Sequence, residues 1–228
     1  MTKSKPTLET FAKVLGRLTE FVVLGKTHLK IGRGIASDVM TDPVIADAAP
    51  VFWGMTLTAH LDIAQLVAFK LFDTRHGTMT IDYLLDRAAD CSGSFQKATP
   101  SQVTAIIAES RSQIASIAAP LAPLRAKRNR VLAHADPTIV GNPERLAKEC
   151  AVTFAGLDAI FKIAGDILNS LNVGYRDTSS WMEIAGGDDY EAVVQLIVDA
   201  KHAMVDKFEA EFGAPPNFAR PKQKKSAW

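Results

Sequence analysis

The sequence predicts an all-α protein, a bundle of about five to seven helices in which the long helices are kinked. Apolar residues recur at three- and four-residue spacing along most of the chain, and the two-residue alternation of a half-buried strand is almost nowhere sustained. The 228 residues are 47% hydrophobic and 22% charged, proportions close to those of folded globular proteins. We therefore expect one helical domain over residues 5–212.

Prolines and glycines divide the apolar pattern into helices. The first helix is predicted over about Thr7 to Asp38, and Asp42-Pro43 ends it. The next spans about Val44 to Phe72, where Pro50 should cause a kink or a new start, and its apolar residues on most sides predict central burial. A shorter helix is predicted over about Thr80 to Ala89.

Prolines also mark helix starts in the second half of the chain. A helix is predicted to begin at Thr99-Pro100, because proline suits the first helical turn. Two prolines interrupt the stretch that follows, so residues 121–135 should form a kinked continuation or a separate helix. Asn142 is the predicted N-cap of a helix that runs from about Pro143 to Leu171.

The chain is predicted to end in a loop, a helix and a tail. Residues 172–187 show no clear period and are predicted to form the loop. The helix is predicted over about Asp188 to Phe212, with five apolar residues on the side that faces the core. These residues are Val193, Leu196, Ile197, Ala200 and Met204. Residues 213–228 are basic and are predicted to form a disordered C-terminal tail.

The composition predicts a cytoplasmic protein rather than a membrane protein. Four polar or charged residues interrupt the longest apolar stretch, residues 48–72, and each would be costly in hydrocarbon: His60, Asp62, Gln65 and Lys70. The N-terminus lacks the apolar core and the cleavage site of a secretory signal. Cys91 and Cys150 show no metal-binding spacing and lie among apolar neighbours, so we expect buried, reduced thiols.

The basic segment Arg125–Asp136 brings an arginine, an amide and a histidine close together in the sequence. Asn129 follows Arg128 directly, and His134 comes five residues after Asn129. On an ideal helix Arg128 and His134 point about 120° apart, so both can border one groove. Two copies of the segment, paired about a twofold axis, would supply two arginines and two histidines to a shared cleft.

These residue types suit cleavage of RNA by its own 2′-hydroxyl, a reaction that needs proton transfer and charge stabilisation. His134 is predicted to transfer the proton at neutral pH. Arg128 remains protonated and is predicted to bind the phosphate oxygens. Asn129 is predicted to support them through a hydrogen bond to the imidazole or to a phosphate oxygen. Three further cations are predicted to bind the RNA backbone without reading its sequence: Arg125, Lys127 and Arg130.

The order Arg-polar-x-x-x-x-His resembles the catalytic signature of HEPN-domain ribonucleases. Within that superfamily the chain is similar to the abortive-infection AbiU-type branch over residues 5–212, through Leu124–Asp136 and through Ala68–Asp73 leading into Thr80–Leu85. The resemblance implies a HEPN-like bundle, a homodimer with the motif at its interface, and metal-independent endoribonuclease activity. It also implies a role as a toxin or phage-defence effector, and such an effector can have an antitoxin or a regulatory protein as its partner.

One position departs from the pattern of some HEPN toxins. Those proteins have a tyrosine two residues after the histidine, which a partner nucleotidyltransferase adenylylates. This chain has Asp136 there. Silencing by that route is therefore not expected.

Two other functions fit the same residues. A basic helical face is often only solvated, so the chain can instead be a non-catalytic homodimeric module that binds RNA or protein, or a structural bundle that binds no nucleic acid. The ribonuclease interpretation is favoured because, among five histidines, only His134 has an arginine six residues before it. His60 is expected in the core, and His28, His76 and His202 at the surface. No metal and no cofactor are expected, because the histidine and glycine spacings of such sites are absent.

Overall fold

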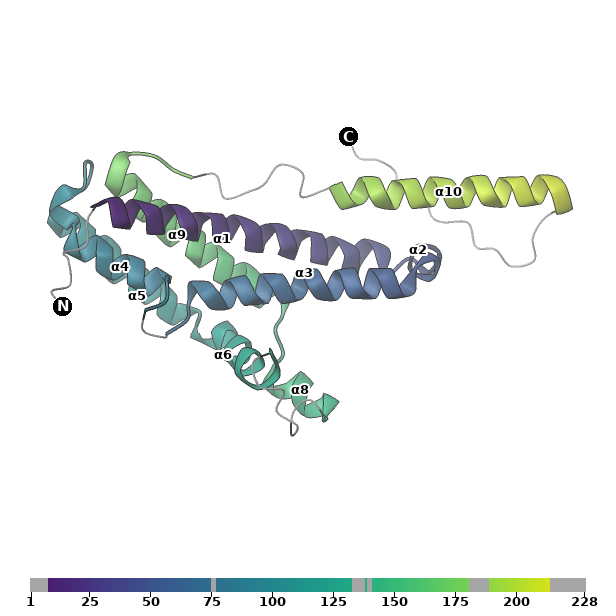
Figure 1. Cartoon of the computed structure of the whole chain (residues 1–228), viewed down its shortest axis with the longest axis horizontal. Helices are drawn as coiled ribbons and strands as arrows, with labels where there is room; N and C mark the ends of the chain where they lie inside the picture. The colour runs from purple at the N-terminus through teal and green to yellow at the C-terminus, as the bar shows by residue number, and fades with distance from the viewer. Residues whose placement is uncertain (1–7, 75–76, 133–137, 139–140, 181–188, 214–228) are drawn as a thin grey trace. The chain divides into compact units, whose positions relative to one another are not determined.

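The computed structural model of the protein describes residues 8–74, 77–132, 138, 141–180 and 189–213. All regular secondary structure in these ranges is helical, which confirms the all-α prediction (Figure 1). The α-helices are α1 (Leu8–Gly34), α2 (Pro43–Ala48), α3 (Pro50–Leu71), α4 (Ile81–Asp90), α5 (Pro100–Ser116), α6 (Ala118–Lys127), α8 (Pro143–Glu149), α9 (Phe154–Arg176) and α10 (Asp189–Phe212). The other helical elements are two π-helical turns, Ile35–Val39 and Arg128–Leu132, and a 3₁₀ turn, Ser92–Ser94. Within the described part of the chain, no helix has both the length and the apolarity that crossing a bilayer requires.

The chain divides into two compact units. The first contains residues 1–27 and 62–183, and the second contains residues 28–61 and 184–228. α1 and α3 therefore each contribute residues to both units. The single domain over residues 5–212 stays a prediction. The predicted tail lies outside the described residues, except for its first residue, Gly213.

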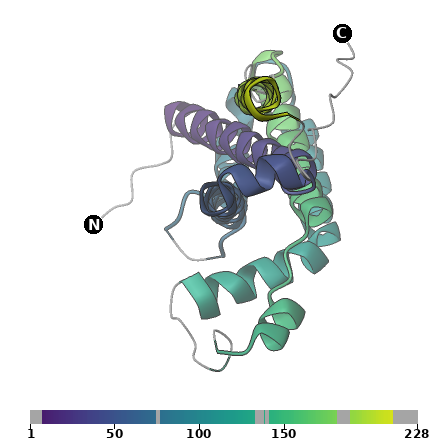
Figure 2. The same ribbon diagram turned by 90° about the vertical axis from the view of Figure 1, so that its right-hand side faces the viewer.

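The core of the first unit is built around α9, whose apolar residues recur every three or four positions. Leu157, Phe161 and Leu168 of α9 are fully buried. α5 contacts α4 and α9, and α6 contacts α8 and α9 (Figure 2). At the end of α9, Tyr175 packs against Phe11 of α1 with ring centroids 5.3 Å apart. Residues far apart in the sequence thus share one core.

Local capping signals identified two helix starts correctly. Thr99 caps α5 through a reciprocal capping box with Gln102, and Pro100 occupies the first turn. Oδ1 of Asn142 accepts a hydrogen bond from the backbone N–H of Arg145 at 3.0 Å and caps α8. Both caps satisfy backbone N–H groups that have no acceptor within the helix.

The predicted helix from Pro143 to Leu171 was wrong, because the structure divides it in two. α8 ends at Glu149, and α9 begins at Phe154 after Thr153, whose Oγ1 accepts a hydrogen bond from the backbone N–H of Gly156 at 3.0 Å. α9 then continues to Arg176, so the first residues of the predicted loop 172–187 are helical. The apolar spacing continues across the break and therefore concealed it.

Central burial of the 44–72 stretch was also predicted, and the structure buries it unevenly: in the first half only Ile45 and Trp53 are buried among the described side chains, whereas most of the buried residues lie in the second half. Pro50 begins a new helix, one of the two outcomes that we predicted. Ala64, Ala68 and Leu71 are fully buried, whereas Val51 and Met55 are 73% and 69% exposed. An apolar surface on every side of a helix does not specify how many sides its neighbours cover.

The core of the second unit is a cluster of apolar side chains from several helices. Its buried members are Ile35, Val39, Ile45, Trp53 and Val198. The predicted core face of α10 was wrong except at Ile197, which packs against this cluster. Val198 and Val205 are buried, whereas Leu196 and Met204 are 69% and 53% exposed. α10 has apolar residues on more than one side, so spacing alone did not identify the side that packs.

Two histidines form a pair inside the second unit. The Nδ1 atoms of His28 and His60 lie 2.9 Å apart. Both residues are half-buried, so the core position predicted for His60 and the surface position predicted for His28 were both wrong. One ring must donate and the other accept, so the pair needs at least one neutral imidazole. Burial lowers the pKa of both rings, and His60 lowers the pKa of His28 further. His202 is half-buried, and His76 lies outside the described residues.

The two cysteines are buried and are not joined in a disulfide, as predicted. Sγ of Cys91 donates a hydrogen bond to the carbonyl oxygen of Arg87 at 3.0 Å. Burial raises the pKa of the Cys91 thiol, so this side chain is held in its unreactive protonated form.

Candidate functional site

The predicted motif begins where α6 passes into a π-helical turn. Residues 121–135 were predicted to form a kinked continuation or a separate helix, and the structure shows a separate helix, α6, followed by the turn Arg128–Leu132. Pro120 fits the first turn of α6, where backbone N–H groups lack helical acceptors, whereas Pro123 stands inside the helix. Single π-helical turns are rare in proteins and are often found at functional sites.

Two neighbours hold the side chain of Arg128 in place. Its Cζ atom lies 4.9 Å from the ring centroid of Phe69, so the guanidinium stacks over a buried aromatic face of α3. Nη1 of Arg128 also donates a hydrogen bond to Oδ1 of Asn129 at 2.7 Å. A guanidinium has five N–H donors, and these two contacts use one of them. These two contacts orient the cation.

The three cations predicted to bind the RNA backbone all have partners within the chain. Nη2 of Arg125 donates to the carbonyl oxygen of Phe72 at 3.4 Å. Nζ of Lys127 lies 3.2 Å from Oδ1 of Asp62. Arg130 forms an ion pair with Glu149. The two carboxylates offset part of the positive charge of the segment. RNA binding by Arg125, Lys127 and Arg130 stays a prediction.

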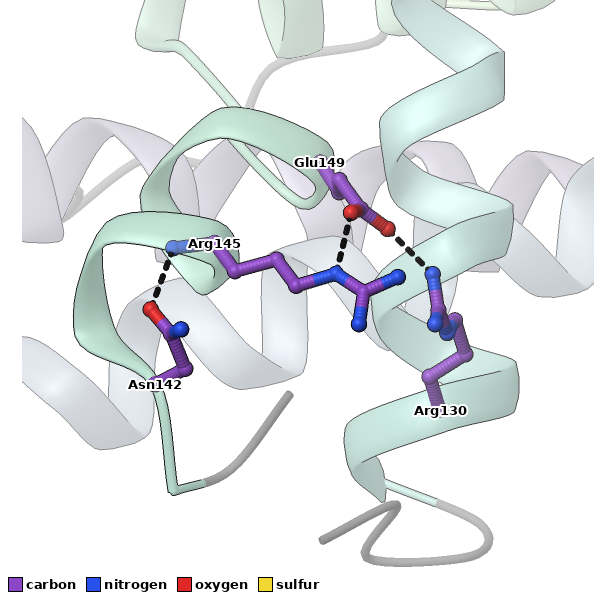
Figure 3. Close-up of polar contacts among 4 residues, drawn as sticks. All are labelled: Arg130, Asn142, Arg145 and Glu149. Carbon is purple, nitrogen blue, oxygen red and sulfur yellow. Dashed lines mark hydrogen bonds and ion pairs between the residues drawn. The ribbon is translucent and has the colours of Figure 1, made fainter. Parts of the chain in front are cut away.

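Glu149, the last residue of α8, is shared by two arginines (Figure 3). Oε1 accepts a hydrogen bond from Nε of Arg145 at 2.6 Å, and Oε2 pairs with Nη1 of Arg130. The bond from Arg145 lowers the pKa of the Glu149 carboxyl below its ordinary value, and Arg130 lowers it further. The carboxylate therefore remains charged at neutral pH and keeps both arginines in place.

The structure brings together only some of the predicted catalytic residues. Arg128 and Asn129 are in direct contact, and Asn129 is exposed. His134 lies outside the described residues. The shared cleft of Arg128 and His134 and the contact of Asn129 with an imidazole or a phosphate therefore stay predictions. Among the described residues, no three His, Cys, Asp or Glu side chains are grouped as metal ligands.

Four residues around the motif were not identified from the sequence. Arg145 and Glu149 are four positions apart on one helix, and this spacing is a signal that was available. Asp62 was recognised as an interruption of an apolar stretch, which indicates a charge that needs a partner. Nothing in the sequence around Phe69 marks it as the residue under Arg128, because that contact depends on how α3 and the π-helical turn meet.

Comparison with known proteins places the motif in a family. No curated protein and no solved structure gave a significant match to the chain. The family model described as AbiU2, of the HEPN superfamily, matches residues 46–196, which is more than half of the chain. The matched stretch contains α3 to α9 and the whole segment from Arg125 to Asp136. The chain therefore belongs to the AbiU2 family of HEPN proteins, a family related to abortive infection.

Proposed function

We propose that the protein is a metal-independent endoribonuclease that acts as a toxin or phage-defence effector. The observation that carries this proposal is the position of Arg128 in a member of the AbiU2 family. Its side chain stacks on Phe69 and donates a hydrogen bond to Asn129 in a π-helical turn. A guanidinium fixed in this way can bind two phosphate oxygens as charge accumulates on them. His134 follows six residues later in the sequence, as the HEPN signature requires.

In the proposed reaction the 2′-hydroxyl of one nucleotide attacks the adjacent phosphorus. A histidine takes the proton from the 2′-oxygen as the bond to phosphorus forms. The bond from phosphorus to the 5′-oxygen breaks, and this oxygen receives a proton. The products are a 2′,3′-cyclic phosphate and a 5′-hydroxyl. General acid–base catalysis by His134 would contribute about 10²–10⁴ to the rate.

A homodimer would complete this site. Twofold pairing along the motif gives one cleft two arginines and two histidines, so that one His134 can accept a proton while the other donates one. Arg128 of each copy would then contact the phosphate between them. We propose this dimer as the active species.

A second function is favoured by the engagement of the other cations. Lys127 and Arg130 each pair with a carboxylate, and these two ion pairs reduce the charge available to attract RNA, whereas Arg125 donates to a neutral carbonyl oxygen. A HEPN protein with this property can act as a non-catalytic homodimeric module that binds RNA or protein. Such a module would show binding without turnover.

Cleavage of single-stranded RNA in excess EDTA separates the two functions. We expect cleavage products with 5′-hydroxyl ends, and we expect Arg128→Ala and His134→Ala each to lower the rate by about 10²-fold or more. Arg111→Ala is the control, because it removes an exposed arginine on α5 that pairs with Asp86. Circular dichroism and light scattering must show unchanged helicity and dimerisation. RNA retention without cleavage would instead identify a binding module.

A further inference from the structure

Two phenylalanine rings of the first unit hold three cations. Cζ of Arg17 lies 4.7 Å from the ring centroid of Phe21, and Nζ of Lys70 lies 5.7 Å from the same centroid. Phe69 directly precedes Lys70 on α3, and its ring holds the guanidinium of Arg128. We call these five residues the cationic strip. They come from α1, α3 and the π-helical turn, and all belong to the first unit.

The two cations that the strip adds to Arg128 are more accessible than those predicted from the sequence to bind RNA. Arg17 and Lys70 are exposed, whereas Arg125, Lys127 and Arg130 are half-buried. A ring contact orders a cationic side chain without neutralising its charge. Arg17 and Lys70 are therefore both ordered and charged at the surface.

Neither of these two cations is neutralised by a buried acid. Arg17 pairs with Glu20, and 56% and 65% of the two side chains are exposed. Water and salt weaken such an exposed pair, so a phosphate can compete for the guanidinium. Among the residues that the structure describes, no carboxylate forms an ion pair with Lys70.

The side of α3 that carries Lys70 also exposes apolar side chains. Leu66, one helical turn before Lys70, is 42% exposed, and Ile63 is 37% exposed. The acids nearest in sequence already have partners, because Asp62 forms the ion pair described above and Asp73 interacts with another residue. Cations beside apolar groups suit a single strand of nucleic acid, whose phosphates and bases can each find a contact.

The arrangement of the cations favours a chain of phosphates over a single anion. Arg17 and Lys70 meet at the ring of Phe21, whereas Arg128 lies over a different ring. Phe69 and Lys70 are successive residues of a helix and point about 100° apart. The three cations therefore do not converge on one point, as the donors of a site for one phosphate would. A polyanion can contact all three.

We propose that the cationic strip binds the backbone of single-stranded RNA and leads the strand from Arg128 across α3 to α1. This inference rests on the proposed function and names the surface that holds its substrate. Arg17 and Lys70 take the role that the sequence suggested for the three cations next to Arg128. Phe21 orders both side chains before RNA arrives, which lowers the entropy cost of binding.

Binding of an RNA that cannot be cleaved tests the proposal in the full-length protein. The probe is a fluorescein-labelled single-stranded oligoribonucleotide with 2′-O-methyl groups, which lacks the attacking hydroxyl. Fluorescence anisotropy gives its Kd between about 50 and 200 mM salt. The variants are Lys70→Gln, Arg17→Gln and Phe21→Leu, and circular dichroism must show unchanged helicity. Lys162→Gln is the matched control, because it removes the same charge from an exposed lysine of α9.

We expect Lys70→Gln and Arg17→Gln each to reduce the slope of log binding constant against log salt by about 0.7, the value for one phosphate contact of a single strand. At about 0.1 M salt this change corresponds to an affinity about fivefold lower. KM for RNA that can be cleaved should rise by a similar factor. Phe21→Leu should weaken binding less and leave the slope unchanged, because both charges remain and only their ordering is lost. Lys162→Gln should behave as the unmodified protein does.

Two results would overturn the proposal. Slopes and affinities of Lys70→Gln and Arg17→Gln that equal those of Lys162→Gln would show that the strip does not contact the RNA backbone. An unmodified protein that does not bind the probe would show that the strip is not a site for RNA. If the probe binds with the expected slopes and ordinary RNA is not cleaved, the cationic strip is supported and the proposed ribonuclease activity fails.

Discussion

Replacement of Gly25 with alanine should destabilise the first unit, although alanine is the better helix former. A Cβ atom at Gly25 would lie 2.2 Å from Cε1 and 2.2 Å from Cζ of Phe161, and 3.1 Å from Cγ1 of Val67. Phe161 is 1% exposed, so its ring is packed on its other sides and cannot move at low cost. Overpacking of this kind typically costs about 1–3 kcal/mol.

Gly16 provides a matched control on the same helix. It is exposed, and no heavy atom lies within 4 Å of a Cβ built there. Gly16→Ala should therefore stabilise the protein by about 0.5–1 kcal/mol through helix propensity alone. Gly25→Ala gains the same propensity, so the difference between the two variants isolates the packing cost. We expect a difference of about 1–3 kcal/mol.

Urea titration followed by far-ultraviolet circular dichroism measures this difference. Gly16 and Gly25 both belong to the first unit, so both substitutions affect the same unfolding transition even if the two units unfold separately. A Gly25→Ala protein that is as stable as Gly16→Ala would refute the reasoning. The approach of α1 and α9 at Gly25 would then leave room for a side chain.

Three further predictions follow from single contacts. Thr153→Ala removes the N-cap of α9 and should lower the free energy of unfolding by about 0.5–2 kcal/mol in the same titration, whereas Thr153→Ser should not. Phe69→Leu should slow RNA cleavage by up to about tenfold, because it removes the aromatic face under Arg128, whereas Phe69→Tyr should retain the rate. The His28–His60 pair should contribute its full stabilisation above about pH 6.5, the ordinary pKa of histidine, and Tm should fall as the pH drops below this value. The reason is that the histidines of the unfolded chain bind protons at a higher pH than the folded pair, whose pKa values are lowered. Replacement of both histidines with glutamine should flatten the profile of Tm against pH, and an unchanged slope would assign the effect to other groups.

The sequence allowed the helix starts to be predicted because capping is local. Thr99 with Pro100, and Asn142 with Pro143, each place a side-chain acceptor next to a proline within two residues. The break before α9 was missed for an equally physical reason. Leu146, Cys150, Phe154 and Leu157 keep a spacing of three or four residues across it. The same spacing is produced by one helix or by two helices that bury their apolar residues in one core.

The candidate site could be predicted only in part for a similar reason. Arg128 and Asn129 are neighbours in the sequence, so their association needed no knowledge of the fold. Phe69 lies 59 positions before Arg128, and the choice of this ring over other aromatic residues is made by tertiary packing. The buried side of α10 was mispredicted because the helix has apolar residues on several sides. Packing against neighbouring helices determines which of these sides is buried.

The π-helical turn at Arg128–Leu132 has a consequence for how this part of the chain can change in evolution. Such a turn accommodates one residue more than an α-helical turn does. Deletion of one residue would therefore let this turn rewind as an ordinary α-helical turn that completes about the same rotation. A single-residue deletion in this turn should be tolerated better than one inside α6, where a deletion would rotate the residues on its two sides by about 100° relative to each other.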